Sequence, residues 1–229
     1  MAPALVVDHP AVADRLARLR DAATPTPVFR RLVEELGVFV AYEATRDLPL
    51  RSEDVTTPVG PATVRRIAGR CVVAPILRAG LGLLPGFLSV VDDAIVAHLG
   101  FFRDPDTLAA IPYYANLPER LDDAAVFALD PMLATGHSAS AALDVLVARG
   151  AVRPTLLCLL AAPAGIVYLR ETHPEARVVT CAIDERLNDH GYIVPGLGDA
   201  GDRMYGSASS VPAGYRTAGA ARSNTKHSD

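Results

Sequence analysis

An acid followed by small and hydroxylated residues, DPMLATGHS at residues 130–138, is the stretch of this sequence best suited to chemistry. An apolar run, residues 124–130, ends in that acid, and residues 139–149 carry apolar side chains at helical spacing. A strand, a tight loop and a helix N-terminus together bind anions, because unpaired backbone N–H groups and the helix dipole converge there. Asp130 could also reach a sugar hydroxyl or a metal-bound water. The stretch therefore predicts a phosphorylated sugar as ligand.

Two arginines adjoin predicted strands and could neutralise an anion. Arg78 comes directly after the apolar run 71–77 and before Gly80, and glycines let a ligand approach the backbone. A solvated strand end explains Arg78 equally well. Arg103 lies in residues 101–118, whose length without a clear period predicts a hairpin or a mobile flap. Most loop arginines are only solvated, so position alone gives Arg103 no role.

A glycine-rich segment, GLGDAG at residues 196–201, formally matches the fingerprint of dinucleotide-binding proteins. That fingerprint needs a strand before it, a helix after it and an acid about 20 residues further on. Here the segment leads through residues 202–206 into small and polar residues, so we reject this interpretation. Glycines beside acids favour a loop that faces a ligand over a plain turn.

A serine hydrolase is the alternative from a different class of enzyme. Residues 136–140, GHSAS, come close to the G-x-S-x-G nucleophile elbow, which places its serine immediately after a strand. Here the loop separates Ser138 from the strand's last residue, Asp130, which argues against an elbow. We expect Ser138 to cap the following helix and to contact phosphate at the same time.

Composition limits the other classes. The chain has 229 residues, half of them apolar, which predicts one α/β domain over residues 1–206 and a disordered polar tail over residues 207–229. The formal charge of −4 gives no support to nucleic-acid binding. Neither a signal peptide nor a run able to span a bilayer is found, so we expect a cytoplasmic protein without a membrane partner.

Cysteines and histidines do not form metal-binding patterns. The three cysteines lack C-x-x-C spacing and lie in apolar runs, which predicts buried free thiols. The histidines show no ligand spacing, and no G-x-x-x-x-G-K-[ST] phosphate loop is present.

The elements that position these residues predict a parallel sheet covered by helices on both faces, because continuous apolar strands alternate with helices. Ligands of such sheets bind at the carboxyl ends of the strands, so Arg78, Arg103, Asp130 and the acids after Ile183 should share one rim. The expected helices span residues 10–21, 26–44 (with Thr26 as cap), 81–90 (disturbed by Pro85), 139–149 and 165–171. The expected strands span residues 71–77, 94–99, 124–130, 155–162 and 178–183, and residues 46–69 should be loops with one short strand.

The loop at residues 130–138 resembles the loop of type I phosphoribosyltransferases that binds 5-phospho-α-D-ribose 1-diphosphate (PRPP). PILRAGLG (75–82) and HGYIVPGLGDAGDR (190–203) narrow the resemblance to the uracil phosphoribosyltransferase family. It extends over residues 9–206 and includes YEATRDL (42–48), FRDPDTL (102–108) and AAP (161–163).

The resemblance implies the reaction uracil + PRPP → UMP + diphosphate, a step of pyrimidine salvage that uses Mg²⁺ held mainly by PRPP and water. It implies the type I phosphoribosyltransferase fold, a mainly parallel sheet flanked by helices, with N-terminal helices and a β-hairpin flap. It also implies a homodimer or homotetramer, and an activator role for GTP in some members. A regulatory relative that binds nucleotide or RNA is the second reading of the same resemblance.

Carried onto matching positions, the resemblance assigns roles. Backbone N–H groups of residues 134–138 would hold the 5-phosphate, Asp130 the ribose hydroxyls, and Arg78 and Arg103 the diphosphate. Arg103 and Asp199 would act electrostatically, and no general base is assigned. The implied PRPP-binding residues are Arg78, Arg103, Asp130, Pro131, Met132, Leu133, Ala134, Thr135, Gly136, His137, Ser138 and Asp199. The implied uracil-binding residues are Ile193, Gly198, Asp199 and Ala200.

These residue types fit the chemistry. Breaking the bond to diphosphate builds oxocarbenium character on the ribose and negative charge on the leaving group, which arginines and Mg²⁺ stabilise better than a nucleophile would. A flap that closes over the site would exclude water.

Four residues depart from the family pattern. His137 replaces a usual second glycine, which would cost strain if that position needs a positive φ. Arg186 replaces a glycine and adds positive charge near the predicted uracil loop. Ala164 replaces a common glutamate, and Pro85 lies in a helix that usually has no proline.

Overall fold

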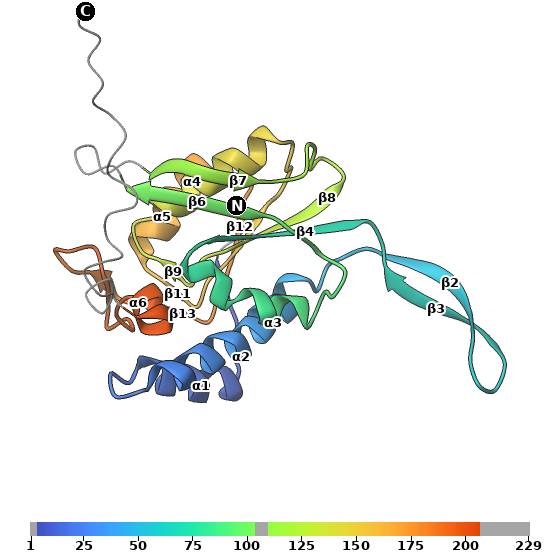
Figure 1. Ribbon diagram of the computed structural model, residues 1–229, viewed down its shortest axis with the longest axis horizontal. Helices are drawn as coiled ribbons and strands as arrows, with labels where there is room; N and C mark the ends of the chain where they lie inside the picture. The colour runs from blue at the N-terminus through green and yellow to red at the C-terminus, as the bar shows by residue number, and fades with distance from the viewer. Residues whose placement is uncertain (1–3, 104–109, 207–229) are drawn as a thin grey trace, which may run out of the picture.

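An eight-stranded sheet forms the centre of the computed structural model, which describes residues 4–103 and 110–206 (Figure 1). Its strand order is β1-β12-β10-β8-β4-β6-β7, with β5 also paired to β4. Neighbouring strands run parallel, except that β6 and β7 form an antiparallel hairpin. The bounds are β1 Leu5–Val6, β4 Arg70–Leu77, β5 Ile95–Val96, β6 His98–Arg103, β7 Ala110–Asn116, β8 Ala124–Leu129, β10 Thr155–Leu157 and β12 Arg177–Thr180.

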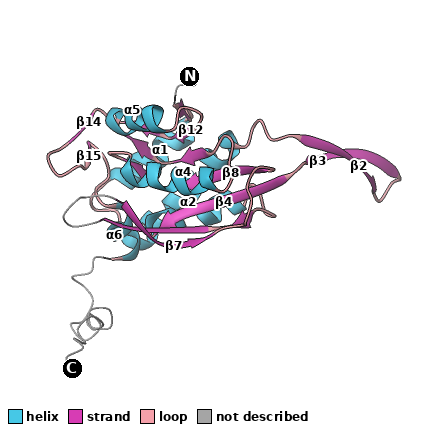
Figure 2. Cartoon of the chain, turned by 90° about the horizontal axis from the view of Figure 1, so that it is seen from above, coloured by secondary structure: helices cyan, strands magenta, loops and turns pink. Residues whose placement is uncertain are grey.

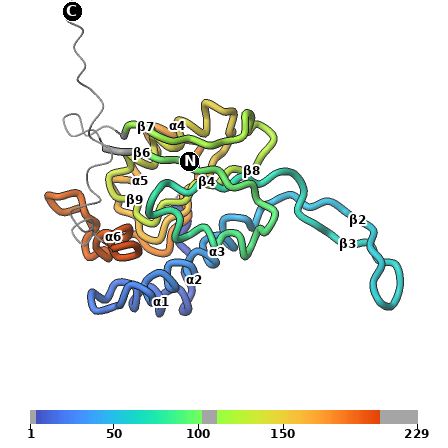
Figure 3. Tube along the Cα trace, viewed as in Figure 1, coloured from blue at the N-terminus to red at the C-terminus, as the bar shows by residue number. Residues whose placement is uncertain are grey.

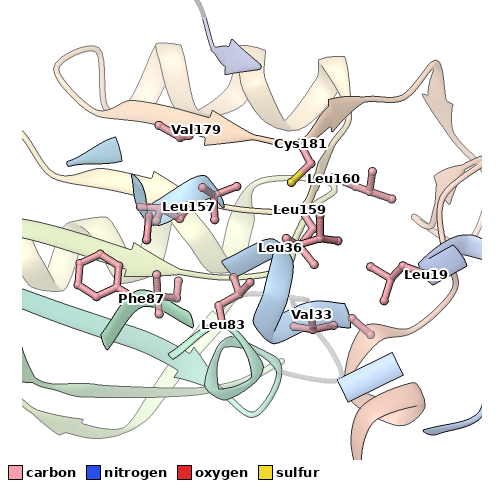
Figure 4. Packing of buried hydrophobic residues seen from close by; sticks show 14 of the residues in the cluster. Leu19, Val33, Leu36, Leu83, Phe87, Leu157, Leu159, Leu160, Val179 and Cys181 are labelled. Carbon is pink, nitrogen blue, oxygen red and sulfur yellow. The ribbon is translucent and has the colours of Figure 1, made fainter. Parts of the chain in front are cut away.

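Helices cover both faces of this sheet, as the sequence predicts. Alternate residues of each central strand point to opposite faces, so Val73 and Phe127 lie in one core cluster and Val72 and Val126 in the other. Figure 4 shows the first cluster, where Phe87 and leucines of the N-terminal helices gather with Leu157 and neighbouring strand residues. On that face lie α1 (Pro10–Arg20), α2 (Thr26–Ala44), η1 (Ala79–Gly82), α3 (Leu84–Leu88) and α6 (Ala200–Tyr205), and on the other lie α4 (His137–Ala148) and α5 (Pro163–Thr172).

The two N-terminal helices match their predicted spans closely, because their apolar periods are regular. Phe29, Leu32 and Leu36 of α2 are completely buried. The predicted cap is wrong: Pro25 occupies the N-cap, and Thr26 is the first helical residue without a capping hydrogen bond. Proline in the first turn suffices to start this helix, since its fixed φ is already helical.

Residues 50–67 form a long hairpin that extends from the body of the protein, where the sequence predicted loops with one short strand (Figures 1 and 2). Strands β2 (Leu50–Thr56) and β3 (Pro61–Ile67) pair along their whole length. Thr57 closes the turn, because its hydroxyl accepts from the Val59 and Gly60 amides at 3.2 and 3.1 Å. Charged residues and prolines are typical of loops, so the sequence did not indicate these strands. They depend on β-branched residues and on exposed cross-strand side-chain pairs.

Several predicted elements are divided in the structure. Figure 3 shows the course of the chain as a Cα trace coloured from the N-terminus to the C-terminus. Strands 155–162 and 178–183 each break once. Their second parts join Met132–Leu133, within the predicted phosphate loop at residues 130–138, in a small parallel sheet beyond the carboxyl ends of the main strands. The predicted helix at 81–90 is instead η1 followed by α3, with Pro85 in the first turn of α3, where its missing N–H costs nothing. The smaller strands are β9 (Met132–Leu133), β11 (Leu160–Ala161), β13 (Ala182–Ile183), β14 (Arg186–Leu187) and β15 (Ile193–Val194).

Two predictions fall outside the described residues: the tail at 207–229 and most of FRDPDTL at the tip of the predicted flap. Within residues 4–103 and 110–206, no helix has the length and apolar character needed to cross a membrane.

Candidate active site

Three strand ends place predicted site residues along one edge of the sheet. Strand β4 lies between β8 and β6 and pairs in parallel with both, so the carboxyl ends of all three meet. Arg78 follows β4, Asp130 follows β8, and Arg103 is the last residue of β6. The Asp130 amide donates to the Leu157 carbonyl at 3.1 Å, which ties the start of the phosphate loop to the next strand. The predicted rim is therefore present in the backbone.

The phosphate loop ends in a helix that begins two residues earlier than predicted. Gly136, with φ of 89°, is the N-cap of α4, and Ser138 lies in the first turn instead of capping it. The loop and this turn line a cavity of about 90 Å³, which has room for an anion of a few heavy atoms. The lining residues are Asp130, Met132, Leu133, Ala134, Thr135, Gly136, Ser138 and Ala139. Orphan amides of the first turn of α4 lie at this cavity, as an anion site requires.

His137 does not have the positive φ that its replacement of a family glycine could have required. The positive φ belongs to Gly136, and His137 is the first residue of α4. Its ring packs edge-on against Tyr168, with centroids 4.8 Å apart. A Cβ on Gly136 would lie 3.0 Å from Tyr168 and 3.1 Å from the Gly165 carbonyl, so both φ and space demand glycine there.

Asp130 is a half-buried carboxyl group with one hydrogen bond. Burial raises its pKa from 3.8 to about 6, although the Met132 amide, which donates to Oδ1 at 3.3 Å, acts in the opposite direction. A ligand that donates hydrogen bonds to Asp130 would favour the ionised form.

The cysteines are free and buried, as predicted. Burial raises the pKa of Cys158 to about 12 and that of Cys181 further, so these thiols stay protonated. They contribute to the core and not to the site.

The glycine-rich segment 196–201 leads into α6, a helix that the sequence did not predict. Asp199 is its N-cap, and its side chain accepts from the Asp202 amide at 2.8 Å. Ile193 and Ala200 are buried as whole residues. Gly198 is exposed.

Contacts between loops bring the three predicted subsites together. A Cβ built on Gly191 would lie 3.8 Å from Thr135 of the phosphate loop, and one on Gly201 would lie 4.0 Å from Ala79. Arg78 also reaches Asp202, with Nη2 and Oδ1 3.7 Å apart. The phosphate loop, the loop at residues 78–82 (the arginine loop) and residues 191–202 therefore lie around one region at the edge of the sheet.

Two arginines near the site have partners that the sequence does not indicate. Arg20 forms a bidentate ion pair with Asp184, and Arg203 donates to main-chain carbonyls of the α1–α2 turn and of the glycine-rich segment. Asp184 was expected at the rim as one of the acids after Ile183, but it is 7% exposed and engaged with Arg20. Nothing local in the sequence marks Arg20, because its partner lies 164 residues away.

The structure combines a mainly parallel sheet, bordered by the β6–β7 hairpin, with an acid and a strand–loop–helix turn at the carboxyl edge of the sheet. This is the architecture of the type I phosphoribosyltransferases. The family model described as uracil phosphoribosyltransferase matches residues 6–207. The chain therefore belongs to the uracil phosphoribosyltransferase family.

Individual relatives agree with this assignment. A protein named uracil phosphoribosyltransferase from Halalkalibacterium halodurans is 48% identical over 208 residues, which cover 90% of this chain and all of the relative. A protein of the same name from Staphylococcus aureus strain Newman is 48% identical over 203 residues, 88% of this chain and 97% of the relative. The solved structure of the AQ2163 protein from Aquifex aeolicus superposes with a TM-score of 0.85 at 37% identity, covering 89% of this chain and 98% of that one.

Proposed function

We propose that this protein transfers the phosphoribosyl group of PRPP to uracil and releases UMP and diphosphate. The observation that carries the proposal is the convergence of the phosphate loop, the arginine loop and the glycine-rich segment at one edge of the sheet. These provide one subsite for each part of the reaction: the 5-phosphate, the departing diphosphate and the base. Membership of the family supplies the identity of that base.

The sugar phosphate would occupy the cavity at the start of α4. Backbone amides of residues 134–138 and the hydroxyls of Thr135 and Ser138 would bind the 5-phosphate, supported by the helix dipole. Pro131, Met132 and Leu133 shape the loop, and Asp130 would accept from the ribose hydroxyls. The cavity that these residues line supports the assignment.

Arg78 and Arg103 would stabilise the charge that develops on diphosphate. Arg78 is 62% exposed, and its ion pair with Asp202 is long. Such an exposed pair contributes little, so diphosphate can replace Asp202 as the partner of Arg78 at small cost. This exchange would bring the arginine to the leaving group only when PRPP is bound.

Uracil would be recognised by main-chain groups of Ile193, Gly198 and Ala200, with Asp199 beside the base and PRPP. Gly198 and Asp199 are exposed beside the cavity that the segment lines, which supports recognition at this point. A fixed row of amide donors and carbonyl acceptors suits a small planar base with alternating acceptors and donors.

The residues at the rim fit Mg²⁺ delivered with PRPP. In the described part of the chain, no cluster of three or more His, Cys, Asp or Glu side chains could hold a metal by itself. Mg²⁺ commonly binds through one or two carboxylates together with substrate phosphates and water, and Asp130 and Asp199 offer such oxygens. When bound, the metal would neutralise charge on the diphosphate.

Further features of the proposal follow from the family resemblance. We propose one catalytic domain over residues 1–206, a homodimer or homotetramer, cytoplasmic location and GTP as an activator. Light scattering tests the oligomeric state, and activity measurements with and without GTP test the activation. Cell fractionation tests the location.

A serine hydrolase has no support in the site geometry. Ser140, not Ser138, contacts a histidine: its Oγ lies 3.1 Å from Nε2 of His173. Asp144 approaches that same nitrogen at 3.5 Å, whereas a catalytic triad places acid and serine on opposite nitrogens. The cluster instead joins α4 to α5. The regulatory alternative, binding nucleotide or RNA, gains no support either, since the relatives are named as the enzyme.

Incubation with PRPP, Mg²⁺ and each of uracil, cytosine, hypoxanthine and orotate tests the function. We expect diphosphate release with uracil alone, and at least about tenfold less with Ser138→Ala, which removes one phosphate ligand. Neither protein should hydrolyse esters. Absence of release with every base would overturn the assignment.

Replacing His137 by glycine should leave PRPP affinity within about threefold, because the imidazole packs on Tyr168 and the strained φ belongs to Gly136. Stability should fall by about 0.5–1 kcal/mol, the usual effect of glycine within a helix. Calorimetric titration with PRPP and urea unfolding measure both quantities. Gly136→Ala is the control and should weaken PRPP binding strongly. A large loss of affinity in His137→Gly would instead place the imidazole on the substrate.

A further inference from the structure

Arg20, in the last turn of α1, holds the first residue of the glycine-rich segment through an ion pair. Its Nη1 and Nη2 donate to the two carboxylate oxygens of Asp184 at 2.7 and 2.6 Å. Nη1 also donates to the Gly196 carbonyl at 2.8 Å, and Asp184 Oδ2 accepts from the Gly196 amide at 2.8 Å. Both polar groups of one residue are thus bound by one charge pair.

A second arginine connects the same two regions in the opposite direction. Arg203 of α6 donates to the carbonyls of Leu19 at 2.8 Å and Asp21 at 2.5 Å, at the end of α1, and to the Leu197 carbonyl at 2.8 Å. Its guanidinium also lies over Phe29, 4.3 Å from the ring centroid. The end of α1 and the segment that begins at Gly196 are therefore joined from both sides.

Gly196 needs such restraint because its backbone conformation is unusual. Its φ is 62°, and a Cβ there would overlap the Ile193 carbonyl, so the chain reverses sharply at this residue. A cavity of about 530 Å³ opens along the segment and is lined by Arg20, Gly196, Gly198 and Asp199. Leu197 anchors the segment in the core, and hydrogen bonds to Gly196 and Leu197 orient the peptides on the side that faces the cavity.

We infer that Arg20 and Asp184 are positioning residues for the base: the pair orients the Gly196 peptide and thereby the Gly198–Ala200 main chain that contacts uracil. The inference rests on the proposed function. A planar base bound by rigid donors and acceptors tolerates little displacement, since misaligned hydrogen bonds weaken steeply. Apart from Asp199, the proposed PRPP ligands lie on other loops, so loss of the pair should affect uracil more than PRPP.

The pair is suited to this role by its chemistry. A guanidinium can bind a carboxylate with two parallel hydrogen bonds and still donate to a carbonyl, which fixes direction as well as distance. A lysine keeps the charge but presents no planar fork. The conservative replacement therefore distinguishes orientation from charge alone.

Steady-state kinetics of Arg20→Met and Arg20→Lys with both substrates test the inference. We expect Arg20→Met to raise KM for uracil at least tenfold while KM for PRPP stays within about threefold, and Arg20→Lys to recover part of this loss. Arg15→Met is the matched control: Arg15 lies on the same helix and pairs with Glu35 at 2.8 Å, away from the segment. Its uracil KM should not change.

Other outcomes are equally informative. Equal increases in both KM values, or the same uracil effect in Arg15→Met, would show a general structural role and overturn the inference. If Arg20→Met does not fold, Arg20→Lys decides alone: an unchanged uracil KM overturns the inference. Absence of uracil transfer in the unmodified protein would instead refute the proposed function, which separates the two failures.

Discussion

Asp130→Asn should nearly abolish turnover and at the same time make the free protein more stable at neutral pH. Burial raises the pKa of this carboxyl to about 6, so at pH 7 the folded state holds a charge that its surroundings disfavour. Asparagine has the same shape without that charge. We expect a gain of about 2 kcal/mol in the free energy of unfolding, together with at least a hundredfold loss of kcat/KM for PRPP.

The pH dependence of the gain follows from the raised pKa. An acid whose folded pKa lies above the unfolded value contributes stability that is fully present below the unfolded pKa and is lost as pH rises through the folded pKa. The two proteins should therefore be similar in stability near pH 4 and diverge up to about pH 7. PRPP binding to the unmodified protein should weaken below pH 6, as Asp130 becomes protonated.

Urea unfolding at pH 4, 6 and 7.5 measures the effect, and Asp184→Asn supplies a control of opposite sign. Burial would raise the pKa of Asp184, but hydrogen bonds from Arg20 and the Gly196 amide outweigh it and lower the pKa. Its contribution to stability is present above the unfolded pKa and is lost as pH falls through the folded one. Asp184→Asn should therefore destabilise at pH 7.5. A destabilised Asp130→Asn at that pH would contradict the argument.

The elements on either side of Asp130 show how far local sequence patterns predict this structure. The run before Asp130 and the helical spacing after Ser138 are local patterns, and they located β8 and the start of α4 to within two residues. The regular apolar period of α2 predicted the span of that helix to within one residue. The predicted N-caps were wrong in both helices. The sequence favours the hydroxyl residues Thr26 and Ser138 as caps of α2 and α4, whereas Pro25 and the left-handed Gly136 occupy these positions.

Features that depend on distant partners could not be predicted. No residue of β2 or β3 is buried, and both strands carry exposed charges, so neither has the apolar face that a half-buried sheet would impose. Arg20 resembles any basic residue in the last turn of a helix, and only the fold brings Asp184 to it. The choice of uracil likewise came from family resemblance, since donor and acceptor directions in residues 193–200 depend on the backbone.

Gly80→Ala should disable the site through the backbone, with no change in any charged group. Gly80 is buried in η1, two residues after Arg78, and a Cβ there would lie well inside 3.0 Å of the Leu129 carbonyl oxygen. Leu129 directly precedes Asp130, so neither neighbour can yield without moving a predicted ligand of PRPP. We expect a loss of about 1–3 kcal/mol in stability, typical of overpacking, and at least a hundredfold loss of kcat/KM.

Two other glycines make the argument testable as a series. At Gly60, in the turn of the β2–β3 hairpin, a Cβ would meet nothing within 4 Å, so Gly60→Ala should be neutral within about 0.5 kcal/mol. At Gly82 the obstacles are side-chain atoms of Met204 and Val33, and a side chain such as that of Met204 adapts more readily than backbone. Gly82→Ala should therefore fall between the two in stability and activity. If Gly80→Ala were as active and as stable as Gly60→Ala, the contact between Gly80 and β8 would not align Arg78 with Asp130. The predicted order of the three variants would show that this backbone contact fixes the distance between the diphosphate and ribose subsites.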